Sequence, residues 1–192
     1  MGALVDFYPE RISVSGKKVS ISASQKYGYI ELADMGKGDY NVQYYQGWEL
    51  PDRAKHLAEE GDIYFGSIWG SVTKWCIIPR ETENVFITNG CLRCRIKEEK
   101  EKYLVDLLSY MNSEGWAIQM RAMARGSDGL AEISEQDAMK VFIPILSDTQ
   151  REELKPFVER LLTGRRTLNT AITSLIENGL YNDPNKRPRV CF

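Results

Sequence analysis

The stretch from residue 17 to residue 96 most constrains how this chain can fold, because it consists of short β-branched, aromatic and apolar runs. Glycine, proline, asparagine and aspartate separate the runs, and these residues end strands and form turns. The runs cover residues 19–21, 27–32, 42–45, 62–68, 74–78, 85–87 and 92–96. Their spacing predicts a curved, mostly antiparallel β-sheet. Residues 40–60 are polar and aromatic and include Pro51, which favours a loop with a short helix.

Helical patterns follow this β-rich stretch. Residues 103–111 carry apolar side chains at helical spacing, and residues 116–124 predict a second helix. Ser134 precedes a run of acidic residues, as the N-cap of a further short helix would, and residues 139–145 predict a closing strand. The pattern indicates an α+β domain with short helices that occupies residues 1–146.

A segment of different character begins at Ser147. Ser147 and Gln150 fit a capping box, and leucine then recurs every seven residues, as in a helix that packs on another long helix. Pro156 predicts a kink. We expect a long, coiled-coil-like helix over residues 147–180 for spacing, dimerisation or partner docking, and a tail over residues 181–192. The residues expected to pack on a partner are Leu154, Val158, Leu161, Leu168, Ile172 and Leu175.

Composition limits the possible partners. The chain has 192 residues, with 25 Lys and Arg against 27 Asp and Glu, so any nucleic-acid contact must come from a local patch. This length favours one ordinary core with an extension over two full domains. Residues 1–20 lack a leader pattern, and no apolar run approaches the roughly 20 residues of a membrane helix. We therefore expect a soluble, cytoplasmic protein without a membrane partner.

The cysteines include one Cys-x-x-Cys pair, Cys91 and Cys94, a spacing that also occurs in zinc and redox sites. A closed zinc site needs four ligands, but the sequence has no second pair, and its single histidine, His56, lies in another segment. Residues 89–96 alternate like a strand, with the arginines on one side and Cys94 on the buried side. These features predict that the chain has no metal site.

Three segments, in this order, resemble motifs of the specificity subunits of type I restriction-modification systems. Residues 29–38 resemble the family's isoleucine and its acidic-to-glycine turn. Residues 61–71 resemble its glycine-aspartate strand with a Gly/Ser turn, and residues 142–152 resemble its hydrophobic-proline segment before a long helix. The chain is similar to a single target-recognition domain of this family, as a half-subunit or a fragment.

The resemblance implies a non-catalytic protein that recognises double-stranded DNA. It would read one half of a bipartite site and present it to methyltransferase and endonuclease subunits. S-adenosylmethionine would bind to the methyltransferase partner, and this chain would hold no cofactor. The family carries two recognition domains separated by long helices, whereas this chain has one domain and one helix. That departure suggests a homodimer that pairs through the C-terminal helix.

Base recognition needs side chains with paired donors or acceptors, such as Arg or Lys for guanine and Gln or Asn for adenine. Such residues gather in three segments, at 43–55, 67–74 and 119–128, and glycines in the last two allow close approach to phosphates. Trp69 and Trp75 flank the Gly/Ser turn and fit core or rim positions better than base stacking. The candidate DNA-binding residues are Gln43, Tyr44, Tyr45, Arg53, Lys55, Ser67, Ser71, Thr73, Lys74, Gln119, Arg121, Arg125 and Ser127.

Catalytic alternatives find little support in the sequence. A methyltransferase needs a glycine-rich cofactor loop and an Asn/Asp-Pro-Pro-Tyr/Phe motif, and the sequence has neither. Nuclease carboxylates must be fixed in a cleft, whereas Glu98 and Glu99 lie in a charged, solvated run. Two other interpretations stay open. One is a β-rich protein-interaction module with a coiled-coil dimerisation helix, and the other is a recognition-domain fragment of a larger methyltransferase-nuclease fusion.

Overall fold

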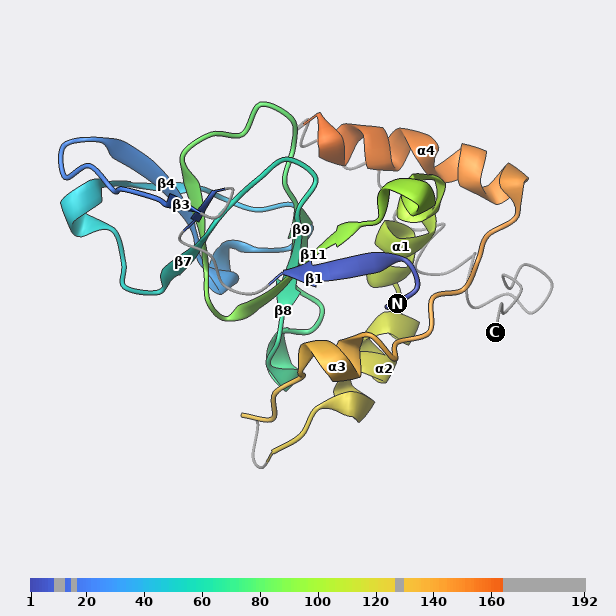
Figure 1. Ribbon diagram of the computed structural model, residues 1–192. Coiled ribbons are helices and arrows are strands. Elements are labelled where there is room, and N and C mark those ends of the chain that lie inside the picture. The colour runs from blue at the N-terminus through green and yellow to red at the C-terminus, as the bar shows by residue number, and fades with distance from the viewer. Residues whose placement is uncertain (9–12, 15–16, 127–129, 164–192) are drawn as a thin grey trace.

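Two β-sheets and a layer of helices form the described part of the chain, which comprises residues 1–8, 13–14, 17–126 and 130–163 of a computed structural model. Figure 1 shows the five-stranded sheet in the middle, with the helices on one side of it and the four-stranded sheet on the other. The fold class is therefore α+β, as the sequence predicts.

The five-stranded sheet has the order β1-β11-β8-β9-β5. Its strands are β1 (Val5–Tyr8), β11 (Cys91–Ile96), β8 (Ile63–Gly66), β9 (Trp75–Ile77) and β5 (Lys37–Gly38). Neighbouring strands are antiparallel except for β5 and β9, which are parallel.

The four-stranded sheet has the order β6-β4-β10-β7. Its strands are β6 (Gln43–Gln46), β4 (Lys26–Ile30), β10 (Val85–Thr88) and β7 (Ala54–Leu57), and only β4 and β10 run parallel. A separate two-stranded ribbon pairs β2 (Ser13–Val14) with β3 (Lys17–Lys18).

The helices begin at the caps that the sequence provides. They are α1 (Leu104–Met111), α2 (Glu114–Met123), α3 (Glu135–Ala138) and α4 (Asp148–Leu162), and the 3-10 turns are η1 (Leu32–Asp34), η2 (Gly47–Glu49), η3 (Trp69–Ser71) and η4 (Glu98–Tyr103). The hydroxyls of Ser113, Ser134 and Ser147 each accept a hydrogen bond from a first-turn amide of α2, α3 and α4. None of the described helices has the length and apolar character that crossing a membrane requires.

The buried side chains form three clusters that follow the layers. The largest lies between the helices and the five-stranded sheet and contains Phe65, Trp75 and Trp116. A second lies between the two sheets, where Tyr64 of β8 meets Ile87 of β10. A third lies on the outer side of the four-stranded sheet. Both faces of each sheet therefore carry buried side chains.

Much of the predicted element order is confirmed. The runs at 62–68 and 74–78 contain β8 and β9, and those at 27–32, 42–45, 85–87 and 92–96 overlap β4, β6, β10 and β11, each of which extends one residue beyond its run. The helices predicted at 103–111 and 116–124 correspond to α1 and α2, and the capping box at Ser147 begins α4. Residues 164–180 of the predicted long helix and the tail at 181–192 lie outside the described residues.

Several expectations were wrong. The strands form two main sheets rather than one, residues 19–21 are not a strand, and β1 was not predicted. Residues 40–60 contain the expected β6 and a short 3-10 helix, η2, but they also contain β7, which was not predicted. Arg93 was expected on an open face but is buried, because Asp62 lies 2.7 Å from its guanidinium.

Residues 139–145 also lack the predicted strand. Their backbone groups are bonded by other means: Gly2 donates to the Met139 carbonyl at 2.9 Å, and the Gln119 amide bonds both backbone groups of Phe142 at 2.9 Å. An apolar segment whose backbone is satisfied in this way needs no neighbouring strand.

Candidate nucleic-acid interface

The first predicted segment lies on β6 and on the strand beside it, β4. Tyr44 is 64% exposed, and the ammonium of Lys26 lies 5.2 Å from the centre of its ring. Gln43 is exposed, but its amide already donates to Asp34 at 2.7 Å and accepts from the Tyr45 hydroxyl at 2.7 Å. Tyr44 and Lys26 are therefore the more accessible groups on this strand pair.

Arg53 and Lys55 lie just before β7 and on it, at the opposite edge of the sheet from β6. The Arg53 guanidinium donates to Asn89 at 3.2 Å and lies 3.8 Å from a Glu31 carboxylate oxygen, and Lys55 is half-buried on β7. Trp48 on η2, which is not among the predicted DNA-binding residues, is 72% exposed. We call the group Lys26, Tyr44 and Trp48, which lie on β4, β6 and the following η2, the β6 surface.

The second predicted segment mainly holds its own turn together. The Ser67 hydroxyl donates to the Gly90 carbonyl at 3.2 Å, and buried Ser71 donates to the Ile68 carbonyl at 2.9 Å. The Lys74 ammonium donates to the Leu32 and Ala33 carbonyls at 3.0 and 3.3 Å. Thr73 is half-buried. These donors already have partners within the protein, so they are poorly placed to read bases.

The third segment contains Gln119, which bonds to the backbone, and two arginines. Gln119 bonds the Phe142 backbone, as described above, and so serves the fold. The Arg121 guanidinium lies 4.9 Å from the centre of the Trp69 ring. Arg125 lies 3.0 Å from Asp137, whose pKa is lowered by hydrogen bonds from Lys140 and Ser134 and by the charge of Arg125. Ser127 lies outside the described residues.

The second and third segments meet in space. Ile68 and Arg125 both pair with Glu132 in isolated β-bridges, and the Trp69 amide donates to the Ala131 carbonyl at 2.9 Å. Figure 1 shows the end of β8 beside α3, away from β4 and β7. We call the group Trp69, Ile118, Arg121 and Arg125, all of it near η3 and the exposed side of α2, the η3 surface. The predicted contacts thus fall on two separate surfaces.

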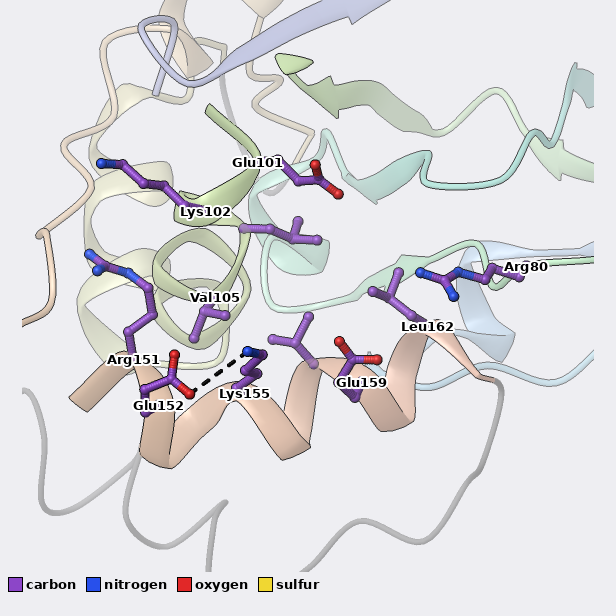
Figure 2. Close-up of a pocket in the computed structure, with 11 residues that line it drawn as sticks. Arg80, Glu101, Lys102, Val105, Arg151, Glu152, Lys155, Glu159 and Leu162 are labelled. Carbon is purple, nitrogen blue, oxygen red and sulfur yellow. Dashed lines mark ion pairs between the residues drawn. The ribbon is translucent and has the colours of Figure 1, made fainter. Parts of the chain in front are cut away.

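A groove that the sequence did not predict lies between α4 and the η4–α1 region (Figure 2). Its volume is ≈ 370 Å³, and Val105 and Val158 line it together with charged residues of both signs. Within it, Lys155 lies 3.8 Å from Glu152. Four basic and three acidic side chains line this groove, so their charges nearly cancel and it offers little attraction for a polyanion.

Cys91 and Cys94, the Cys-x-x-Cys pair, both lie on β11. Cys91 belongs to the cluster between the sheets, whereas Cys94 belongs to the cluster under the helices, so the two thiols point to opposite faces of β11. Burial raises the pKa of Cys91 to about 12 and also raises that of Cys94. Among the described residues, no group of three or more histidine, cysteine or acidic side chains is arranged to hold a metal ion.

The leucine pattern of α4 is used inside the domain as far as the structure describes it. Leu154 and Val158 are buried in the cluster that also holds Leu107 and Leu108 of α1, and Leu161 is half-buried against it. Leu168, Ile172 and Leu175 lie outside the described residues, so the predicted contact between two copies rests on them.

Comparisons with known proteins place the fold. No protein-family model matches the chain, and no curated protein matches its sequence. A chain from a structure of a type I restriction-modification system, solved to explain its complex assembly and conformational transition, aligns with a TM-score of 0.54 and 18% identity over 72% of this chain and 37% of that chain. The HsdS subunit from Thermoanaerobacter tengcongensis aligns with a TM-score of 0.54 and 15% identity over 72% of this chain and 36% of that subunit.

These alignments show a shared fold. The resemblance predicted from the three motifs is confirmed at that level, because the chain folds like part of a type I specificity subunit. The chain spans little more than a third of the length of each of these two proteins.

Proposed function

We propose that this chain is a non-catalytic recognition module that binds double-stranded DNA in a sequence-specific manner for a type I restriction-modification system. The observation that carries the proposal is the fold shared with the HsdS subunit over 72% of this chain. Methylation and cleavage would belong to partner subunits, and S-adenosylmethionine would bind to the methyltransferase.

The η3 and β6 surfaces are the proposed contacts with DNA. The η3 surface offers two arginine forks, which suit guanine edges and phosphates, and the β6 surface offers exposed Tyr44 and Trp48 together with Lys26. The net charge of the chain is −2, so such local patches must supply the attraction for DNA.

The module would read one half of a bipartite site. A homodimer that pairs through Leu168, Ile172 and Leu175 would place two identical modules on inverted half-sites, and the target would then be an interrupted palindrome. Docking to a methyltransferase subunit would bring the recognised site to the catalytic chain.

Selection from random-sequence duplex DNA tests this function. The purified chain is incubated with the library alone and together with a type I methyltransferase subunit, and the retained DNA is sequenced. We expect a short motif, present as inverted copies if the chain dimerises, and an affinity that falls steeply with salt because counterions are released. No enrichment in either arm would contradict the proposal and favour the protein-interaction module.

A further inference from the structure

Arg121 and Trp69 form a stacked pair at the centre of the η3 surface. Trp69 begins η3 and is 45% exposed, while Arg121 lies in the last turn of α2. The guanidinium carbon lies 4.9 Å from the ring centre, within the range of a cation–π interaction. Two segments distant in sequence therefore form one surface unit.

The backbone that carries this pair is held firmly on both sides. The indole nitrogen of buried Trp116, on α2, donates to the Val72 carbonyl at the end of η3 at 2.7 Å. Trp69 itself donates from its amide to Ala131 at 2.9 Å. One hydrogen bond therefore joins α2 directly to the end of η3 and holds together the two segments that carry the ring and the guanidinium.

The two arginines of this surface differ in their interactions within the protein. Arg125 is paired with Asp137 at 3.0 Å. Among the described residues, Arg121 has no ion pair, and its buried Nε has no hydrogen-bond partner. The ring of Trp69 orients Arg121 without using the donors at the outer end of the fork, and these donors stay available to a ligand.

We propose that Trp69 is a positioning residue that holds the Arg121 fork in place to read one guanine in the major groove. The inference rests on the proposed DNA-binding function. A guanidinium group held in one orientation can donate to the O6 and N7 acceptors of guanine at once. Because its orientation is already restricted, it loses less conformational entropy on binding. In this assignment Trp69 does not stack on a base, because the guanidinium covers its ring.

The test compares matched variants of the full chain in the DNA selection described above, in the presence of the methyltransferase subunit. Arg121→Lys keeps the charge and loses the fork, so we expect discrimination at one guanine position to fall roughly 10- to 100-fold while the rest of the motif stays unchanged. Trp69→Leu should relax the same position, and Trp69→Phe, which keeps an aromatic face, should retain most of it. The double variant should be no worse than Arg121→Lys alone.

Controls separate this role from a structural one. Arg121 also places a positive charge near the C-terminal end of α2, which stabilises a helix, and lysine preserves that effect. The thermal midpoint of Arg121→Lys should therefore match that of the wild type. Arg125→Lys is the matched control on the same surface and should leave the Arg121-dependent position unchanged.

Four outcomes would overturn the inference. An equal loss for all sequences with an unchanged motif would make Arg121 a phosphate contact. Relaxation by Arg121→Lys without any effect of Trp69→Leu would remove the positioning role. If the wild-type chain itself selects no motif, the proposed function fails and this inference fails with it, whereas a retained motif in every variant overturns the inference alone.

Discussion

His56 makes folding sensitive to acid. It is buried on β7 with its ring 5.6 Å from that of Tyr64, and neither ring nitrogen has a hydrogen-bond partner among the described residues. Burial, with a smaller effect from the charge of Arg93, lowers the pKa of His56 from 6.5 to about 4. As pH falls below 6.5, His56 binds a proton in the unfolded chain but stays neutral in the folded chain. The free energy of unfolding therefore falls until about pH 4, by roughly 3 kcal/mol in all.

His56→Phe should flatten this dependence, because phenylalanine keeps a ring beside Tyr64 and does not titrate. Urea unfolding between pH 6 and 4.5 tests this prediction best, because two other groups change stability outside that range. The pKa of the Met1 amine is lowered to about 6, so its effect lies above pH 6, and the pKa of Glu31 is lowered from 4.5, so its effect lies below pH 4.5. His56 is the single histidine in the chain, so an NMR titration reports its pKa without ambiguity. A measured pKa near 6.5 would contradict this prediction.

Asp62, in the glycine-aspartate motif, is the buried anchor of an ion-pair cluster. Its carboxylate lies 2.7 Å from both Arg93 and Arg95, accepts from the Tyr64 hydroxyl at 3.3 Å and also bonds the Glu59 amide at 3.0 Å. Asp62→Asn leaves the guanidinium of buried Arg93 with Glu59, which is partly exposed and 3.5 Å away, as its remaining charge partner. We expect a loss of about 3–5 kcal/mol in the free energy of unfolding. Denaturant unfolding measures it.

Glu59→Gln is the matched control for Asp62→Asn. Glu59 also lies 3.0 Å from Arg95, but its side chain is 36% exposed, so solvent screens the interaction. We expect a change of at most about 1 kcal/mol. Equal losses for the two variants would show that burial does not set the strength of this cluster.

At the scale of elements, an ion pair between Arg151 and Asp106 links α4 to α1. The carboxylate of buried Asp106 accepts from Arg151 Nε at 2.9 Å and from the Leu146 amide at 2.7 Å. Arg151→Met keeps the length of the side chain but leaves Asp106 without its charge partner. We expect a loss of about 3–5 kcal/mol and faster amide hydrogen exchange along α4.

Glu152→Gln is the comparison for this prediction. It removes the exposed pair in which Glu152 and Lys155 lie 3.8 Å apart, and it should change stability by less than about 0.5 kcal/mol. If Arg151→Met changed the exchange rates of α4 no more than Glu152→Gln does, α4 would be held by its apolar contacts alone.

The elements that were predicted correctly are those whose signal is local. Apolar periodicity identifies α1 and α2, and a serine capping box identifies the start of α4. By contrast, the segment around β7 is polar and charged in sequence. It forms a strand because it pairs with β10, and Ala54 and His56 are buried there. The opposite error occurs at residues 139–145, where the local sequence predicts a strand. The Gln119 side-chain amide and the Gly2 backbone amide supply hydrogen bonds to this segment, so no neighbouring strand is needed.

At the scale of the whole molecule, the sequence indicates which residue types recognise DNA but not which of them are free to do so. Ser67, Lys74 and Gln119 have suitable donors, yet the fold uses those donors to join segments 20 or more residues apart. Exposed Trp48 was missed because no periodic pattern marks a lone aromatic in a turn. Separation of the contacts into two surfaces follows from sheet topology, which short-range patterns do not encode.

The leucine pattern leads to a prediction about assembly. Its first part, Leu154 and Val158, is buried within the domain, so a chain cut after residue 163 keeps the clusters described above. We expect residues 1–163 to unfold cooperatively and to sediment as a monomer, whereas the full chain sediments as a dimer. The variant Leu168→Asp in the full chain should also be monomeric, because it places a charge in the proposed contact.

DNA selection with the same proteins connects assembly to recognition. If two copies read inverted half-sites, the full chain should enrich two copies of one motif at fixed spacing, and residues 1–163 should enrich one copy of that motif. Ser67→Ala is a suitable control because it changes the domain and leaves the helix intact, and it should preserve the spacing. A full chain that is monomeric at all concentrations and still enriches paired motifs would contradict the dimer and require a partner chain to supply the second half-site.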